Sequence, residues 1–539
     1  STFPAKVVLF SLSSLSSLST LIFSGNHMGK VWEEEKKEEK EEKEEEKEKE
    51  GNEFLSSFGN LPPSLSSITA VHCHLPSFPL SLLSLSSCLS SLILMRNHFT
   101  EIPSEIASLS LLRVLDLDEN EISFLPPAVG GLTNLETLLL KGNGLKEISE
   151  NVFENLVNLQ ALDISHNPLN SLPPSLGKAS SLSILSAHHC SLSSVSSLFC
   201  SSAPLSLSTL DLNHNELESL SPSSSPWEFM PYLRILKLSN NSISEIESPD
   251  TLFNMAELEE IYLANNQLKE LPTEFSSLST LLKLCLDFNS LSSLPDIFSS
   301  FPSLLTLTLA SNNLSSIPSS FSSLTCLSEL SLSHNPELKD SVNILFDIES
   351  LEKLYLCNIG LPGLPENIAN LQNLLRFDVS WNPEITSLPE EASEMKYLER
   401  LNLEGCNIKE VGKELFQNIY GLLELNLSHN QLCSPLPSNF EEMGDGCDMI
   451  LDHNAEVEKE EMEKIMRRRE NQSISCLNIA HSDMIGLRPT MEDAFTVVSP
   501  YKGSAGIFVG LYDGHGGREV ASLAAQKHPK ILLDLMVGE

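Results

Sequence analysis

Leucine recurs along most of the chain in the order Leu-x-x-Leu-x-Leu-x-x-Asn, a motif of nine positions. Complete copies cover residues 112–120, 135–143, 281–289 and 304–312. Leucines at positions one, four and six of a short extended segment point inward, and the residues between them face solvent. A single copy cannot bury its leucines alone, so neighbouring copies must stack. The pattern therefore predicts a solenoid of short parallel strands.

The ninth position of the motif recurs eighteen times, at a spacing of 23 to 26 residues from Cys73 onward. Most copies have asparagine there, whose amide can bond backbone groups where the chain turns away from the strand. Cysteine replaces it three times as a small residue for a buried slot, whereas Ile359 cannot form these bonds and predicts a local irregularity. The ninth positions are Asn26, Cys73, Asn97, Asn120, Asn143, Asn167, Cys190, Asn215, Asn241, Asn266, Asn289, Asn312, Asn335, Ile359, Asn382, Cys406, Asn430 and Asn454.

These copies resemble the leucine-rich repeat family over most of the chain. The resemblance implies an α/β solenoid of about 18 repeats, with a parallel sheet on its concave face. Proline follows leucine or isoleucine at a fixed place in several repeats and marks the turn on the convex side, because proline cannot extend strand pairing. Examples are Ile102-Pro103, Leu125-Pro126, Leu294-Pro295 and Ile317-Pro318.

Changes in composition divide the chain into five segments. Residues 1–30 are expected to be the remnant of an N-terminal repeat, and 31–52 a solvated Glu/Lys-rich insertion with twelve Glu and six Lys between Glu33 and Glu50. The main array is expected over 53–455, followed by a charged linker or terminal helix over 456–474. Because the chain begins with Ser1 and no capping segment precedes the first repeat, we expect further repeats upstream.

Charge and cysteine content limit the classes of partner and compartment. The formal net charge of −39 argues against a nucleic-acid partner, because phosphate backbones require Lys and Arg. The eleven cysteines include no Cys-x-x-Cys pair, which favours a reducing compartment. The apolar stretch over residues 7–23 is broken by serines and too short for a membrane span. These features predict a cytoplasmic protein without a membrane span.

Four aromatic residues stand out at the variable positions of the C-terminal half. Tyr262, Phe288, Tyr355 and Trp381 lie between the leucines of their repeats. Exposed Tyr and Trp are typical of binding hot spots, so we expect a protein partner on the concave face. The alternative is that each ring packs against its strand neighbours.

Single and paired histidines also occur on the predicted strands, at His188, His189 and His214. No carboxylate or second ligand lies at metal-binding spacing along the sequence. We therefore interpret these histidines as structural or solvated.

Residues 475–539 differ from the repeats and contain a candidate metal site. Two β-prone runs cover 494–499 and 506–513, and the second delivers Asp513 at its end. The Asp513 carboxylate and the Gly514 carbonyl could bind one hard cation, with a further oxygen from Glu492. Oxygen ligands without thiols suit Mg²⁺ or Mn²⁺, and Arg488 could hold a phosphate in a bidentate manner. The alternative is that Asp-Gly-His-Gly-Gly forms only a hairpin turn.

The motif Gly-x-Arg-x-x-Met-Glu-Asp at 486–493, combined with Val-x-Leu-Tyr-Asp-Gly-His-Gly-Gly at 509–517, resembles the start of the PPM-type (type 2C) serine/threonine phosphatases. The resemblance implies an α+β domain with a β-sandwich and two Mg²⁺ or Mn²⁺ ions that activate water toward a phosphoprotein substrate. The implied metal ligands are Glu492, Asp513 and Gly514. Arg488 would bind the phosphate, Asp493 would orient metal-bound water, and His515 would act as general acid.

Further aspartates of that family do not follow before Glu539, so we expect an incomplete domain and an inactive fragment of a phosphatase. In this reading the repeats select the substrate of the catalytic domain. Two alternatives stay open. One is a non-catalytic leucine-rich repeat scaffold in signalling. The other is part of a protein similar to the fungal adenylyl cyclases, which also carry repeats followed by a phosphatase-like domain.

Overall fold

The structure is a computed structural model that describes residues 19–24, 61, 64–195, 206–219, 230–246, 255–412, 419, 421–433, 447–454, 494–498 and 508–512. These residues belong to two compact units. The first comprises Ser1–Cys433 with Asp448–Glu456, and the second comprises Ser434–Cys447 with Val457–Glu539. Among the described residues, no helix has the length and apolar character that crossing a membrane requires.

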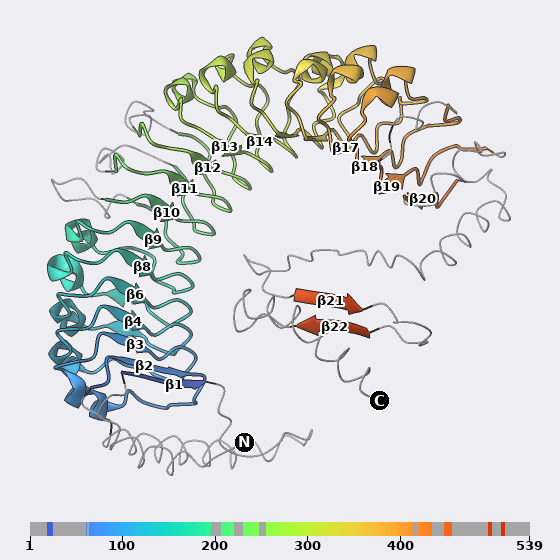
Figure 1. The fold of residues 1–539 in the computed structure, drawn as a ribbon. Coiled ribbons are helices and arrows are strands. Elements are labelled where there is room, and N and C mark those ends of the chain that lie inside the picture. The colour runs from blue at the N-terminus through green and yellow to red at the C-terminus, as the bar shows by residue number, and fades with distance from the viewer. Residues whose placement is uncertain are drawn as a thin grey trace, which may run out of the picture. The chain divides into compact units, whose positions relative to one another are not determined.

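Eighteen strands of the first unit form one parallel sheet, one strand for each repeat (Figure 1). The fourth motif position of each strand pairs with the fourth position of the next, as Leu115 does with Leu138. The predicted parallel solenoid is thereby confirmed. The strands are β1 (Thr20–Ser24), β2 (Ser67–Val71), β3 (Ser91–Ile93), β4 (Val114–Asp116), β6 (Thr137–Leu139), β8 (Ala161–Asp163), β9 (Ile184–Ser186), β10 (Thr209–Asp211), β11 (Ile235–Lys237), β12 (Glu260–Tyr262), β13 (Lys283–Cys285), β14 (Thr306–Thr308), β15 (Glu329–Ser331), β16 (Lys353–Tyr355), β17 (Arg376–Asp378), β18 (Arg400–Asn402), β19 (Glu424–Asn426) and β20 (Asp448–Ile450).

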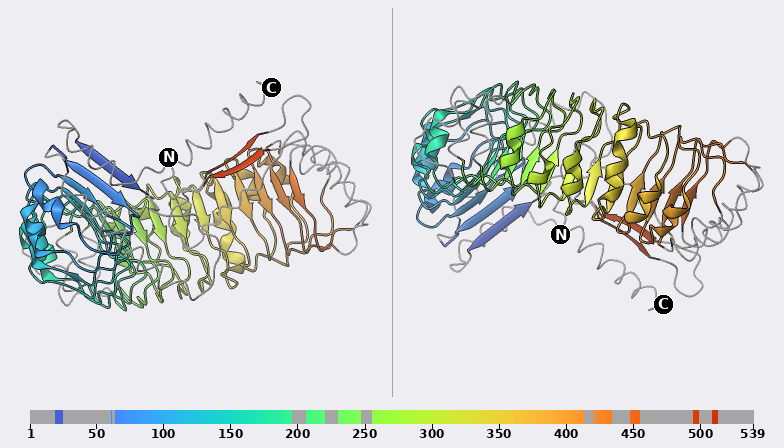
Figure 2. Two further views of the ribbon diagram at one scale, coloured as in Figure 1. Left: turned by 90° about the horizontal axis from the view of Figure 1, so that it is seen from below. Right: turned by 90° about the horizontal axis from the view of Figure 1, so that it is seen from above.

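Short 3-10 helices cover the other side of the array, and the sheet lines the inner, concave side of the curve (Figures 1 and 2). Proline precedes many of these helices, with φ near −70° at Pro103, Pro126 and Pro318, so the chain leaves the extended state at that residue. The predicted convex-side turn is therefore present. The helices are η3 (Leu80–Leu85), η4 (Ser104–Ser108), η5 (Pro127–Gly131), η6 (Val152–Asn155), η7 (Pro174–Lys178), η10 (Thr273–Ser277), η11 (Phe298–Ser300), η12 (Ser319–Ser323), η13 (Lys339–Asp347), η14 (Glu366–Asn370) and η15 (Glu390–Glu394). A two-stranded parallel sheet, β5 (Phe124–Leu125) with β7 (Glu147–Ile148), joins two repeats outside the main sheet.

The core between the sheet and the helices is continuous from repeat to repeat. Leucines at the first, fourth and sixth motif positions are almost completely buried, and phenylalanines fill the space under the helices. Phe298 packs edge-on against Phe301 in its own repeat and against Phe321 in the next. Since burial of one such side chain contributes about 1.5–3 kcal/mol, stability accumulates along the stack.

The ninth-position asparagines form a buried hydrogen-bond ladder. Asn335 is fully buried, and its Nδ2 donates to the carbonyls of Leu309 at 2.9 Å and Leu332 at 2.8 Å. Its Oδ1 accepts from the Leu314 amide at 3.0 Å. The same bonds recur at the other asparagines, for example Asn312. The amide therefore satisfies turn backbone of two consecutive repeats, as the motif predicts.

Cysteine at the ninth position keeps only part of this pattern. The buried Cys190 Sγ donates to the Ile164 carbonyl at 3.2 Å, as an asparagine Nδ2 would. A thiol offers no amide oxygen in return. The Leu169 amide, whose counterpart Leu145 bonds an asparagine side chain, instead bonds the Asn167 carbonyl. Burial raises the pKa of the Cys190 thiol to about 12, so this cysteine is a structural residue.

The repeat that precedes Ile359 is irregular, as its sequence predicts. It contains η13, the longest of the described 3-10 helices, and Lys339 adopts a φ of 36°. The Ile359 amide bonds Asn382 Oδ1 at 3.1 Å, and its side chain is fully buried without replacing the asparagine bonds.

The first two strands of the sheet pair directly, with Thr20 beside Ser67, although 42 residues (25–66) lie between β1 and β2 in the sequence. The pairing places the Asn26 and Cys73 repeats next to each other in the sheet. The predicted Glu/Lys-rich insertion lies between these two adjacent strands in the sequence. Its own residues lie outside the described part of the chain.

The residue before the ladder has a left-handed backbone in every repeat from Cys73 onward. Its φ lies between 50° and 66°. Its amide donates to the next repeat, as His166 N does to the His188 carbonyl at 2.8 Å, so sheet-like bonding continues beyond the strand. We call these residues the eighth-position row. They are His72, Arg96, Glu119, Gly142, His166, His189, His214, Asn240, Asn265, Phe288, Ser311, His334, Asn358, Trp381, Gly405, His429 and His453.

The described part of the second unit is an antiparallel pair of strands, β21 (Ala494–Val498) and β22 (Phe508–Tyr512). Ala494 pairs with Tyr512 and Val498 pairs with Phe508. Both strands occur where the sequence predicts them. The predicted catalytic and metal-binding residues Arg488, Glu492, Asp493, Asp513, Gly514 and His515 lie outside the described residues.

Candidate functional site

Two of the four predicted partner-binding aromatics lie on strands of the concave face. Tyr262 ends β12 and Tyr355 ends β16, and both side chains are half-buried. The Tyr262 hydroxyl donates to Glu260 Oε2 at 2.7 Å, and Lys283 Nζ lies 5.0 Å from its ring centroid. Burial, followed by the Glu260 contact, raises the pKa of Tyr262. Tyr262 thus packs partly against its strand neighbours, as the alternative interpretation expected.

The other two aromatics belong to the eighth-position row. Phe288 has a φ of 54° and is 60% exposed, and Trp381 has a φ of 57° and is 49% exposed. Bulky side chains are uncommon at positive φ, because their β-carbons crowd the backbone there. The Asn289 and Asn382 ladder bonds hold the turns that carry them. These two rings are presented to solvent from a fixed backbone.

The four aromatics form two separate pairs along the sheet. Tyr262 and Phe288 come from adjacent repeats, as do Tyr355 and Trp381, and strands β14 and β15 lie between the pairs. The sequence predicts one face for all four residues, but the structure does not bring them into one cluster.

Trp381 is the first of three neighbouring rings at the C-terminal end of the array, followed by His429 and His453. A β-carbon on Gly405 would lie 2.7 Å from Trp381 Cδ2, so the indole covers the space where the next repeat has no side chain. The indole lies 5.7 Å from the His429 ring, which stacks on His453 at 4.2 Å. Glycine at residue 405 thus permits both the left-handed turn and the position of Trp381.

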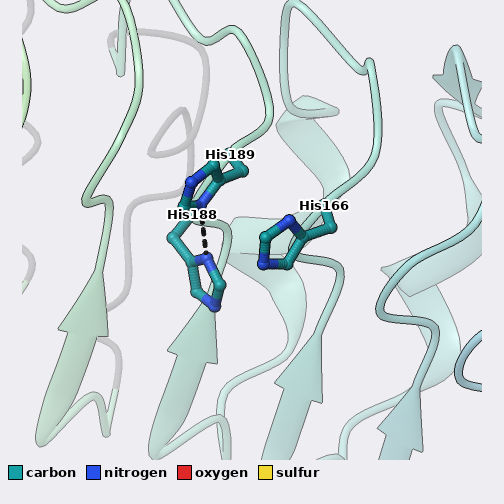
Figure 3. A group of neighbouring side chains, drawn as sticks. All are labelled: His166, His188 and His189. Atoms are coloured by element: carbon teal, nitrogen blue, oxygen red, sulfur yellow. Dashed lines mark hydrogen bonds between the residues drawn. The ribbon is translucent and has the colours of Figure 1, made fainter. Parts of the chain in front are cut away.

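A second group of rings gathers near the middle of the row, at His166, His188 and His189 (Figure 3). His166 follows β8 and the other two follow β9, the neighbouring strand. One ring nitrogen from each residue lies within 4.8 Å of the other two. His188 Nδ1 and His189 Nδ1 are 2.9 Å apart, so one ring donates a hydrogen bond to the other. His166 stacks on His189 at 4.3 Å, and His189 stacks on His214 at 4.1 Å.

The surroundings of these histidines favour neutral imidazole rings. Burial, followed by the neighbouring His214, His166 and His188, lowers the pKa of His189 to about 4. Burial is also the first cause of the lowered pKa values of His166 and His188. Neutral imidazole is the form that binds metal ions.

The interpretation of His188 and His189 from linear spacing is wrong in one respect. It found no second ligand, but His166 lies one repeat away along the chain and next to them in space. An alignment of the repeats contains the missing signal. His166 and His189 occupy the same motif position in consecutive repeats, and equivalent positions of stacked repeats are neighbours.

Comparisons with known proteins agree with the repeat architecture. Models described as "Leucine rich repeat" match residues 87–145, 133–192, 205–268, 231–291, 279–336 and 421–443. No curated protein matches the chain. A solved leucine-rich-repeat protein of Leptospira interrogans is 28% identical, with a TM-score of 0.60, and the match covers 73% of this chain and 91% of that protein.

Two further solved structures share the fold at lower identity. The functional domain of InlJ from Listeria monocytogenes is 20% identical, with a TM-score of 0.53, and the match covers 69% of this chain and 74% of that chain. The Toll protein of Drosophila, solved with Spätzle, is 19% identical, with a TM-score of 0.55 and coverage of 70% and 57%. The motif, the ladder, the parallel sheet and the family matches agree, and the chain is a leucine-rich-repeat protein.

Proposed function

We propose that the array is a scaffold that binds a protein partner on its concave face. The observation that carries this proposal is the exposure of Phe288 and Trp381 on a backbone held by the asparagine ladder. Such rings gain contact area on binding without first losing backbone freedom, which is typical of hot spots. Toll, which has the same fold, was solved in complex with Spätzle.

Charge on the concave face supports a protein partner over a nucleic acid. Several Arg and Lys residues there are paired with carboxylates of the adjacent repeat, as in Arg234–Glu259 at 2.6 Å and Lys353–Glu329 at 3.1 Å. Paired cations are less able to neutralise phosphates, and the net charge of −39 repels a nucleic acid. A partner with exposed cations and apolar side chains fits this face best.

The test is the effect of Trp381→Ala and Tyr355→Ala on the affinity for a partner isolated with the unaltered chain. We expect Trp381→Ala to weaken binding about 30-fold, as for a hot spot worth about 2 kcal/mol. The matched control is Tyr397→Ala, because Tyr397 is 65% exposed but precedes its strand instead of lying in the row. Equal affinities for all variants, measured by calorimetry, would contradict the proposed surface.

We propose a second function for residues 475–539, as part of a metal-dependent protein phosphatase. The observation in its favour is the register of β21 and β22, which places Ala494 beside Tyr512. Glu492 and Asp493 precede Ala494 in the sequence, and Asp513 follows Tyr512. The hairpin thus joins the two sequence motifs from which the PPM-type resemblance was drawn. Mg²⁺ or Mn²⁺ would activate water in such a site.

Phosphate release from a phosphothreonine peptide tests this second function. In a protein that carries the whole domain we expect Mn²⁺-dependent release, and Asp513→Asn should abolish it because a ligand carboxylate becomes a neutral amide. Arg488→Ala should raise KM through loss of a phosphate contact. Release that persists unchanged in Asp513→Asn, or that needs no metal, would rule the assignment out and leave the scaffold alone.

A further inference from the structure

We propose that His166, His188 and His189 form a binding site for a Zn²⁺ ion on the concave face of the array. The three rings come from two adjacent repeats, and one nitrogen of each lies within 4.8 Å of the others. Figure 3 shows the His166 ring directed from its own loop toward the other two. This site is separate from the Mg²⁺ or Mn²⁺ site proposed for the C-terminal unit.

The backbone that carries the three rings is fixed by hydrogen bonds between repeats. His166 N donates to the His188 carbonyl at 2.8 Å, and His189 N donates to the His214 carbonyl at 3.0 Å. The ladder residues Asn167 and Cys190 follow directly in the sequence and are buried. An ion therefore meets ligands whose Cα positions are already set, and only the rings must adjust.

The adjustment of the rings is small. Zinc binds imidazole nitrogen at about 2.0–2.1 Å, so two ligands of a tetrahedral ion lie roughly 3.3 Å apart. The present separations, from 2.9 Å between His188 and His189 to the 4.8 Å limit, bracket this value. The His166 and His189 rings are nearly parallel, at 15°, so one must turn about χ2, a torsion with a broad energy well. For both Nδ1 atoms to bind the ion, the ring that donates this hydrogen bond changes tautomer, so that its hydrogen moves to Nε2 and the ring stays neutral.

The donor set selects the class of metal. Imidazole suits Zn²⁺, Cu²⁺ and Ni²⁺, whereas Mg²⁺ and Ca²⁺ prefer oxygen. The nearby Cys190 thiol is directed into the core, where it donates to the Ile164 carbonyl, and so supplies no sulfur. His166 and His189 are exposed, which leaves a fourth coordination position for water.

The charged side chains around His188 favour a cation at that ring. Asp163 and Asp211 end the strands on either side of His188 and interact favourably with a positive charge there. Lys141 opposes it, and Lys237 pairs with Asp211 at 3.2 Å. At His188 both carboxylates act more strongly than Lys141, whereas at His166 Lys141 acts more strongly than Asp163.

Another stack in the same row provides a matched control. His429 and His453 stack at 4.2 Å, nearly as His166 and His189 do, but the residue equivalent to His188 is Asp452, and among the described residues this pair belongs to no group of three close ligand atoms. The two stacks therefore differ in the third ligand. If stacking alone bound zinc, the two pairs would behave alike.

Zinc binding is measured by calorimetry on the full untagged chain, with Mg²⁺ in excess to occupy oxygen-ligand sites. The variants are His188→Ala, His166→Ala/His189→Ala and the control His429→Ala/His453→Ala. We expect one ion per chain in the unaltered protein and the control, with equal affinity. Loss of a ligand should weaken binding by about 100-fold or more, since even outer-shell changes cost about 10- to 100-fold. Circular dichroism checks that each variant is folded.

A thermal melt provides a second readout, because zinc that binds only the folded state raises the Tm. The increase should occur in the control and disappear in His166→Ala/His189→Ala. The proposal is overturned if folded His188→Ala binds zinc as tightly as the unaltered chain. It is also overturned if the control loses as much affinity as the site variants, or if the unaltered chain takes up no zinc.

Discussion

At the scale of single residues, Asp118 on the concave side is a carboxyl group whose charged form is disfavoured by burial and by a neighbouring carboxyl. The Lys141 amide donates to its Oδ1 at 2.6 Å, which fixes the carboxylate between repeats. Burial, followed by repulsion from Asp116, raises the pKa of Asp118 to about 7. Asn213 holds the equivalent place four repeats later and accepts the Ser239 amide at 2.7 Å with an uncharged side chain.

We therefore expect Asp118→Asn to stabilise the array above pH 7. The native carboxyl keeps its proton up to about pH 7, whereas the unfolded one loses it near pH 4, so stability of the unaltered protein falls as pH rises through this window. Asparagine does not titrate, so the variant does not lose stability in this pH window. Because Asp118 is partly exposed, we expect the stabilisation by Asp118→Asn, measured as free energy of unfolding, to be about 1–2 kcal/mol larger at pH 8 than at pH 5. Urea unfolding at both pH values measures it, and an equal effect at both would contradict the raised pKa.

At the scale of the repeat element, the ladder asparagine links each turn to its neighbour. We expect Asn335→Ala to lower the free energy of unfolding by about 2–4 kcal/mol, because it removes the hydrogen bonds of the side-chain amide and leaves buried backbone groups unpaired. Asn335→Asp is the matched comparison, since it keeps the Oδ1 acceptor but loses the Nδ2 donor. Denaturant midpoints that do not change in Asn335→Ala would show that the ladder is dispensable.

The repeat element also shows what the sequence could and could not predict. The positions of the eighteen strands follow from leucine spacing, and the β21 and β22 strands from alternation of apolar residues. The left-handed eighth position was not predicted, because residues as different as Trp381, Glu119 and Ser311 adopt it. The ladder bonds and the amide contacts to the next repeat impose that conformation, so it depends on stacking more than on the residue itself.

At the scale of the whole chain, stacking makes residues one repeat apart into neighbours. Sequence reasoning therefore found the concave face but missed the cluster of His166 with His188 and His189. The same property explains why Phe288 and Trp381 belong to one row although 93 residues separate them. The roles expected for Arg488, Glu492, Asp493, Asp513, Gly514 and His515 stay predictions, because these residues lie outside the described part of the chain.

The eighth-position row also limits how this chain can diverge over generations. Its backbone disfavours β-branched residues, and none of the seventeen positions holds valine, isoleucine or threonine. Seven positions hold histidine. Replacement of such a histidine by asparagine or glycine would cost little folding stability, because both residues tolerate positive φ. In relatives of this chain, joint retention of histidine at residues 166, 188 and 189 would record selection for a shared ligand. Independent drift at each of the three would record selection for the turn alone.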